Sequence, residues 1–135
     1  MRYVLDTTAF SGLMKRDAEI LELIREYPPG DIVTVPPVVA EIQFGIERLS
    51  SSSKKYFLLK SEKDRLLSVI KVLPWSSEAS NHFGKIKAHL EQVGKMIDDF
   101  DIAIGAIAIA HKFGVITANK GHFKRIKDLE CKGWS

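Results

Sequence analysis

The sequence has little sulfur to use for cross-linking or metal binding, because its 135 residues include a single cysteine, Cys131. One cysteine cannot form a disulfide within the chain, and no Cys/His cluster has the spacing of a zinc site. The longest apolar run, residues 102–110, is much shorter than a bilayer span, and the first residues lack the apolar core of a signal peptide. We therefore expect a single cytoplasmic domain over residues 1–135 with no membrane partner.

The charge balance is mildly positive, with a formal net charge of +3 at pH 7. Such a value is compatible with a polyanionic partner but does not require one. Basic residues gather in the last quarter of the chain, at Lys112, Lys120, Lys124, Arg125, Lys127 and Lys132. As a group they modestly favour nucleic-acid binding, and Lys120, Lys124 and Arg125 are the candidate RNA contacts. Any one of them alone is better explained by a solvated surface.

Short apolar strands alternate with helices along the chain. Strands are predicted at residues 2–6, 32–35, 69–73, 115–117 and 129–132, and helices at 9–15, 18–27, 36–49, 54–70, 77–93 and 98–113. This alternation favours parallel β-α-β units and a three-layer α/β/α sandwich. Thr7 and Thr8 are expected to cap the first helix and Gly114 to end the last one, and residues 119–122 are expected to form a loop.

Polar side chains follow two of the predicted strands, at the carboxyl ends where open α/β sheets bind ligands. Asp6 follows the first strand, and Thr117 and Asn119 follow a later one. Glu41 borders the apolar stripe of its helix, where a carboxylate is costly unless it is paired or metal-bound. It would equally suit the helix dipole near that helix's first turn, so both interpretations stay open.

Three aspartates, Asp98, Asp99 and Asp101, precede the most apolar predicted helix. Asp98 and Asp101 share a helical face, whereas Asp99 points elsewhere. Aspartates are ordinary N-caps, but three of them exceed what capping requires. Asp6, Glu41 and Asp101 come from three separate elements, and we expect them to converge above the sheet.

Hard divalent cations bind carboxylate oxygens, and carboxylates forced together repel one another unless a cation neutralises them. One or two such ions can activate water and stabilise in-line displacement at phosphorus. Thr8 would then bond a metal-bound water, or it simply caps its helix; the sequence does not separate these roles.

Four segments of the chain, in order, match motifs of a known family. They read YVLDTTAF, VPPVVAEIQFGIERL and, for the third and fourth together, GKMIDDFDIAIGAIAIAHKFGVITANKGHFKRI. Each is common alone, but all of them in this order on a chain of this length are specific. The sequence resembles the PIN-domain ribonucleases, and among them the VapC-type toxins of toxin–antitoxin pairs, over nearly its whole length.

The resemblance implies a central parallel sheet of four or five short strands and a site that binds Mg²⁺ or Mn²⁺. Asp6 and Asp101 would be the principal metal ligands, Glu41 would complete the catalytic acids, and Asp98 would be an auxiliary ligand. Thr8, Thr117 and Asn119 would assist. Many members carry an aspartate at the position of Asn119, and the amide adds no charge, which weakens the case for a second tightly held metal.

The implied function is a metal-dependent endoribonuclease, the toxin of a type II toxin–antitoxin system, with an RNA substrate, a cognate antitoxin and a homodimeric state. The alternative is a non-catalytic PIN-like module that binds RNA or protein, which Asn119 keeps open. A haloacid dehalogenase-type phosphatase would need a second aspartate at Thr8, and a receiver domain would need an acceptor aspartate where Pro74 and Trp75 stand. The four histidines show no ligand spacing and are interpreted as surface or packing residues.

Overall fold

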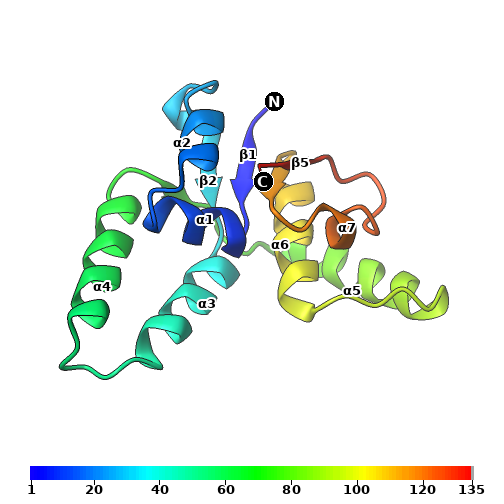
Figure 1. Ribbon diagram of the computed structural model, residues 1–135. Coiled ribbons are helices and arrows are strands. Elements are labelled where there is room, and N and C mark those ends of the chain that lie inside the picture. The colour runs from blue at the N-terminus through cyan, green and yellow to red at the C-terminus, as the bar shows by residue number, and fades with distance from the viewer. Residues whose placement is uncertain (135) are drawn as a thin grey trace.

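The computed structural model describes residues 1–134 and has a five-stranded, fully parallel sheet in the order β3-β2-β1-β4-β5 (Figure 1). The strands are β1 (Tyr3–Leu5), β2 (Ile32–Thr34), β3 (Lys71–Val72), β4 (Gly114–Thr117) and β5 (Cys131–Gly133). Parallel neighbours cannot be joined by tight hairpins, so each connection crosses over through helical segments. The predicted α/β class and the position of every predicted strand are confirmed.

Seven helices connect the strands: α1 (Thr7–Met14), α2 (Ala18–Ile24), α3 (Pro36–Glu47), α4 (Lys54–Leu67), α5 (Ser77–Gln92), α6 (Asp99–Ala110) and α7 (Lys120–Phe123), in the part of the chain up to residue 134. Polar side chains that accept a backbone N–H begin five of them, namely Asp6, Asp17, Ser53, Ser76 and Asp98. Two prolines open α3, where the missing N–H costs nothing. No helix in residues 1–134 is both long and apolar enough to cross a bilayer.

Three local expectations are wrong. Asp6, and not a threonine, caps α1, because Thr7 and Thr8 already belong to its first turn. Lys112, with φ of 62°, provides the left-handed turn after α6. Gly114 instead begins β4, where a Cβ would lie 2.7 Å from the ring of Tyr3 and 3.0 Å from the Glu130 carbonyl oxygen. The expected loop at 119–122 contains α7.

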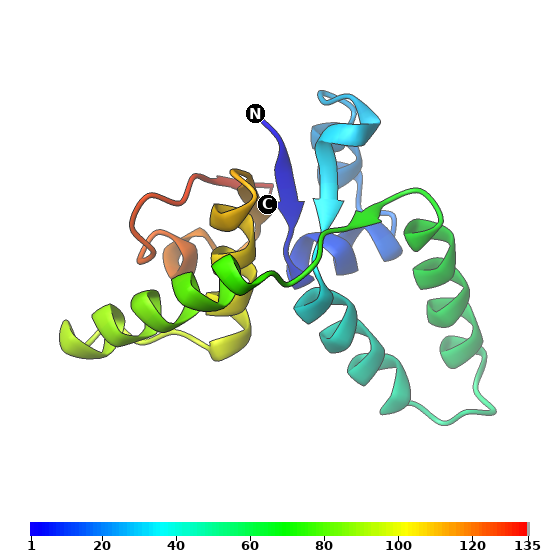
Figure 2. The ribbon, with the colours of Figure 1, turned by 180° about the vertical axis from the view of Figure 1, so that it is seen from behind.

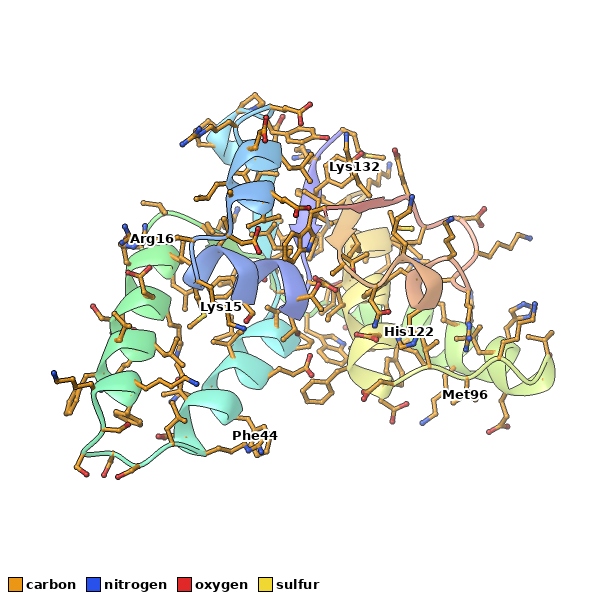
Figure 3. All side chains as sticks on the ribbon, viewed as in Figure 1. Lys15, Arg16, Phe44, Met96, His122 and Lys132 are labelled. Carbon is orange, nitrogen blue, oxygen red and sulfur yellow. The ribbon has the colours of Figure 1, made fainter. Side chains whose placement is uncertain are left out.

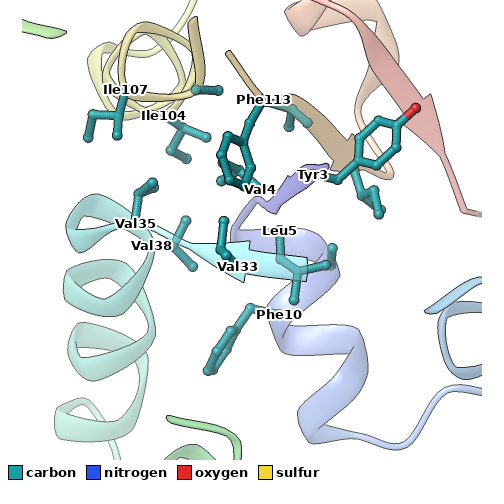
Figure 4. Close-up of a cluster of buried hydrophobic side chains, with 14 of the residues drawn as sticks. Tyr3, Val4, Leu5, Phe10, Val33, Val35, Val38, Ile104, Ile107 and Phe113 are labelled. Carbon is teal, nitrogen blue, oxygen red and sulfur yellow. The ribbon is translucent and has the colours of Figure 1, made fainter. Parts of the chain in front are cut away.

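Apolar side chains cover both faces of the sheet, because successive residues of a strand point to opposite sides. On one face, Val4 and Val33 meet side chains of α3 and α6, and on the other, Leu5 lies toward Phe10 of α1 (Figure 4). α1 and α2 lie in front of the sheet in Figure 1 and behind it in Figure 2. The layers therefore follow from the central strands β1, β2 and β4, which are buried on both faces, whereas β3 is exposed and β5 is partly buried.

The sheet order places the carboxyl ends of β1 and β4 side by side. β1 and β4 pair directly, with Leu5 opposite Ile116, so the residues that follow them leave the sheet together. α6 packs on β1 and β4, and since it runs into β4, its N-terminus lies at the carboxyl edge of the strands. Three chain segments thus meet at one edge of the sheet.

Candidate active site

Asp6 is the most deeply placed acid of the chain, with an exposed fraction of 2%. Its Oδ1 accepts hydrogen bonds from the Thr8 hydroxyl at 2.6 Å and the Ala9 N–H at 2.8 Å. Its Oδ2 accepts from the buried Thr117 hydroxyl at 2.5 Å. A buried carboxylate held by three donors has a fixed position, which is what a metal ligand or a catalytic group requires.

The same two threonines join the segments that follow β1 and β4. The Thr8 hydroxyl accepts from the Ala118 N–H at 2.9 Å, and the Thr117 hydroxyl accepts from the Asn119 N–H at 2.7 Å. Each hydroxyl therefore accepts from the backbone of one segment and donates to Asp6. Thr8 acts here as a link between loops rather than as a helix cap.

Burial is the main cause that raises the pKa of Asp6 above its ordinary value of 3.8. The hydrogen bonds from Thr117 and Thr8 act in the opposite direction, because they stabilise the charged form. The Asp6 carboxylate is thus buried, and its hydrogen-bond donors stabilise its negative charge.

Asp101 lies in the first turn of α6, with a side chain that is 20% exposed and an Oδ2 atom 3.4 Å from Nδ1 of His122. Burial raises its pKa, the contact with His122 lowers it, and the charges of Asp6, Asp98 and Glu41 raise it further. Asp101 therefore lies close enough to three other carboxylates, from three elements, for their negative charges to act on it.

Glu41 and Asp98 stand at the border of this cluster. Glu41 of α3 is partly buried, and its Oε1 accepts from the Thr7 hydroxyl at 2.5 Å. Asp98 is exposed and caps α6 through the Phe100 N–H at 2.9 Å. Both acids line a cavity of about 430 Å³ beside Phe44 and Phe100, which leaves room for a substrate at the acidic site.

Asp99 points away from the cluster, since it forms an ion pair with Lys87 of α5 at 3.0 Å. It is the poorest placed of the three aspartates, in keeping with its helical geometry. Its exposed position and its charge make it a suitable control for substitutions of Asp101.

His122 is the residue that sequence reasoning missed. Its Nδ1 lies 3.0 Å from the Asn119 amide nitrogen and 3.4 Å from Asp101, so it accepts from the amide or donates to the carboxylate according to its tautomer. Figure 3 shows it at the lower centre, turned toward α6. The three-residue spacing of Asn119 and His122 was the available signal, but it acquires meaning only once residues 120–123 are helical.

The three candidate RNA contacts, Lys120, Lys124 and Arg125, lie in different surroundings in the structure. The Lys120 side chain lies along Gly133, in a cleft that also contains glutamates of α2, and so it is directed away from the acids. Lys124 is exposed on the surface. Arg125 donates from Nη1 to the Met96 carbonyl oxygen at 3.0 Å, close to the start of α6.

The acids have the chemistry of a site for a hard cation, because every candidate donor is a carboxylate or amide oxygen. Among residues 1–134, no three acidic, histidine or cysteine side chains already surround one point closely enough to coordinate an ion. Glu41 and Asp101 are each held by one side-chain partner, Thr7 and His122, that a cation would replace. The residues thus fit a divalent metal through oxygen ligands, with side chains that must close around it.

Comparison with known proteins identifies a matching family and similar chains. Residues 3–129 match the PIN domain family. The chain is 34% identical over 97 residues to Ribonuclease VapC2 of Rickettsia felis, across 72% of this chain and 69% of that protein. It is 28% identical over 135 residues to Ribonuclease VapC2 of Haemophilus influenzae, across 99% and 98%. The crystal structure of VapBC2 from Rickettsia felis bound to a promoter DNA fragment contains a similar chain, with a TM-score of 0.84, 29% identity and full coverage of both chains.

Proposed function

This chain belongs to the PIN-domain family and, within it, to the VapC ribonucleases, and we propose that its acidic site hydrolyses RNA phosphodiester bonds with a bound Mg²⁺ or Mn²⁺ ion. It is accordingly the toxin of a toxin–antitoxin pair. We take RNA as the substrate because the relatives of this chain are named ribonucleases. An RNA target implies action in the cytoplasm.

The observation that carries the proposal is the convergence of four carboxylates from three chain segments at the carboxyl edge of the sheet, around Asp101. Asp6, Asp98 and Glu41 all raise its pKa, and none of the Lys or Arg ion pairs within residues 1–134 reaches Asp6, Glu41 or Asp101. A protein retains such a cluster at the carboxyl edge of a sheet when a cation neutralises it. Divalent metal is the cation that carboxylates bind and that RNA hydrolysis uses.

In this mechanism Asp6 and Asp101 would hold the metal, and Glu41 and Asp98 would complete the set of ligands. When bound, the cation supplies Lewis acidity that activates water and offsets the charge developing on the phosphate. Thr8 and Thr117 keep Asp6 oriented through their hydroxyl donors.

Two protein partners belong to the proposal. The antitoxin is the first, because the similar Rickettsia felis structure is a VapBC pair, and VapBC is named a family of toxin–antitoxin systems. A second copy of the chain is the other. An apolar surface supports a homodimer: a cavity of about 390 Å³ runs between Pro36, Trp75, Phe83 and Phe100, and Trp75 is 45% exposed.

The test is cleavage of a mixed RNA pool by purified wild type, Asp6→Asn and Asp101→Asn, in Mg²⁺, Mn²⁺ or EDTA. We expect cleavage that requires metal and that both substitutions abolish. Asp99→Asn is the matched control, because it removes the same charge from the same helix terminus and should cleave like wild type. Undiminished cleavage by both active-site variants would exclude the assignment.

The alternative is a non-catalytic RNA- or protein-binding module, for which Asn119 is the favourable observation. The Asn119 amide adds no charge to the site, and its nitrogen contacts Nδ1 of His122. Metal-dependent turnover excludes this alternative, whereas RNA binding without cleavage under any metal would support it.

A further inference from the structure

A second cavity, of about 380 Å³, lies between α5 and the segment that follows α7. Its floor is apolar and is made by Ile86 and Leu90 of α5, Ile109 of α6 and Ile126. Leu90 and Ile126 are buried members of the core, so the floor is held in place. The volume falls within the range of small-molecule sites, roughly 300–1,000 Å³.

The rim of this cavity is cationic. Lys85, Arg125 and Lys127 stand around it against one acid, Asp128. Two histidines of α5, His82 and His89, complete the rim, and Glu78 lies 3.7 Å from His82. An apolar floor beneath three positive charges suits a ligand that combines a flat apolar group with an anion.

One rim residue, Arg125, links this cavity to the segment that leads into α6. Arg125, on the rim, donates to the carbonyl oxygen of Met96, two residues before Asp98. Three residues before Arg125, His122 contacts Asp101. Figure 3 labels His122 and Met96, both on the lower side of the molecule. These contacts place Arg125 of the rim beside the segments that contain Asp98 and Asp101.

An unpaired nucleotide has the chemistry that this cavity would recognise. Proteins bind single-stranded RNA by packing splayed bases on apolar, aromatic, histidine or arginine surfaces, and they bind its phosphates with Lys and Arg. We propose that this cavity binds one unpaired nucleotide flanking the cleaved bond, with its base on the isoleucine floor and its phosphate on Lys85, Arg125 and Lys127. The proposal rests on the ribonuclease function proposed above.

The proposal has a consequence for substrate choice. Bases inside an A-form duplex are stacked and cannot reach such a cavity, whereas those of loops and single strands can. The enzyme should therefore prefer RNA whose cleavage site has an unpaired neighbour. An acidic peptide of a protein partner would also complement the rim charge, but it would not require a base.

The first experiment observes the cavity without any cleavage. Wild-type protein with labelled isoleucine δ1 methyl groups is titrated in EDTA with AMP, CMP, GMP and UMP, and separately with ribose 5-phosphate. We expect shifts at Ile86, Ile109 and Ile126, no shift at Ile20 on the other side of the sheet, and weaker shifts with ribose 5-phosphate because it lacks a base. Unshifted floor methyls at millimolar nucleotide would overturn the proposal.

The second experiment measures the rim with RNA. The double variant Lys85→Ala/Lys127→Ala is compared with Lys54→Ala/Lys60→Ala, a pair of exposed lysines on α4. Losing the contact with one phosphate should reduce the salt dependence of binding to a fluorescein-labelled single-stranded RNA by up to about 0.7 in the log–log slope, the value for one neutralised phosphate on a single strand. Affinity should fall roughly tenfold or more at low salt, with the loss in kcat/KM carried by KM.

The outcomes separate this proposal from the ribonuclease function. Unchanged affinity and KM in the rim variant, with active wild type, would overturn the nucleotide site alone. Loss of antitoxin binding with unchanged RNA binding would assign the cavity to a protein and would also overturn it. Wild type that cleaves no RNA would contradict the ribonuclease function, while the methyl titration would still decide whether the cavity binds nucleotides.

Discussion

Replacing Asp101 by asparagine should stabilise the metal-free protein while it destroys catalysis. The side chain is 20% exposed and keeps its shape in the variant, but it loses a negative charge that burial and three neighbouring carboxylates disfavour. Removing one charge from a repulsive set is worth about 0.5–2 kcal/mol in the free energy of unfolding. For a chain of this length we expect the melting temperature in EDTA at pH 7 to rise by about 2–6 °C.

The effect should depend on pH in a defined direction. The pKa of Asp101 is raised in the folded state above its ordinary value of 3.8. Between the pKa of the unfolded chain and that of the folded protein, the folded protein therefore binds more protons than the unfolded chain. The free energy of unfolding of wild type therefore falls as pH rises through the folded pKa. The variant lacks this loss, so its advantage should be small near pH 4 and complete at neutral pH.

Divalent metal should reverse the order of stability. An ion at 100 times its dissociation constant adds about 2.7 kcal/mol to a protein that binds it only when folded. Wild type should gain this in Mg²⁺, whereas Asp101→Asn should gain little. Cleavage by the variant should fall by about 10²-fold or more, because each 1.36 kcal/mol of lost transition-state stabilisation is a factor of ten.

The assay is thermal unfolding between pH 4 and 8, in EDTA and in Mg²⁺, of wild type, Asp101→Asn and Asp99→Asn. The control removes an exposed charge paired with Lys87, so it should change stability by less than about 1 kcal/mol and show no reversal with metal. A variant at Asp101 that is less stable than wild type at pH 7 in EDTA would refute the reasoning from like-charge repulsion.

Three further substitutions test the site and its support. Thr117→Val removes a donor from Asp6, so it should cost about 1–3 kcal/mol, raise the pKa of Asp6 and lower kcat, whereas Thr117→Ser should stay near wild type in urea unfolding and in rate. Gly114→Ala puts a methyl group against the Tyr3 ring and the backbone beside it, and it should cost about 1–3 kcal/mol; an unchanged melting temperature would contradict the packing. Ile104→Ala, in the fully buried face of α6, should cost about 2–5 kcal/mol in urea unfolding, and a loss under 1 kcal/mol would mean that α6 is not a core helix.

Much of the fold was predictable from the sequence because it depends on neighbours along the chain. The alternation of apolar strands and amphipathic helices predicted the α/β class, and the strands near residues 2–6, 32–35 and 115–117 formed where expected. The prediction that Thr7 and Thr8 cap α1 was wrong because Asp6 competes for the N–H groups of the first turn and is the stronger acceptor. The choice between these residues depends on backbone angles at Asp6 that propensities do not specify.

The acids of the site were likewise identifiable by residue type and position, since each stands at the end of a strand or in an early turn of a helix. Their mutual repulsion, the bond from Thr117 to Asp6 and the contact of His122 with Asp101 were not predictable. Thr117 and Asp6 are 111 residues apart, and only the direct pairing of β1 with β4 brings them together.

The sequence by itself thus determined the strands, all the helices except α7, and which side chains can bind a hard cation, because these properties belong to residues and their near neighbours. The tertiary structure decided the strand order, the position of the Lys120 side chain along Gly133 and the hydrogen bond from Arg125 to the Met96 carbonyl oxygen. These depend on contacts between residues far apart in the chain, whose free energy is gained only when the whole core is packed.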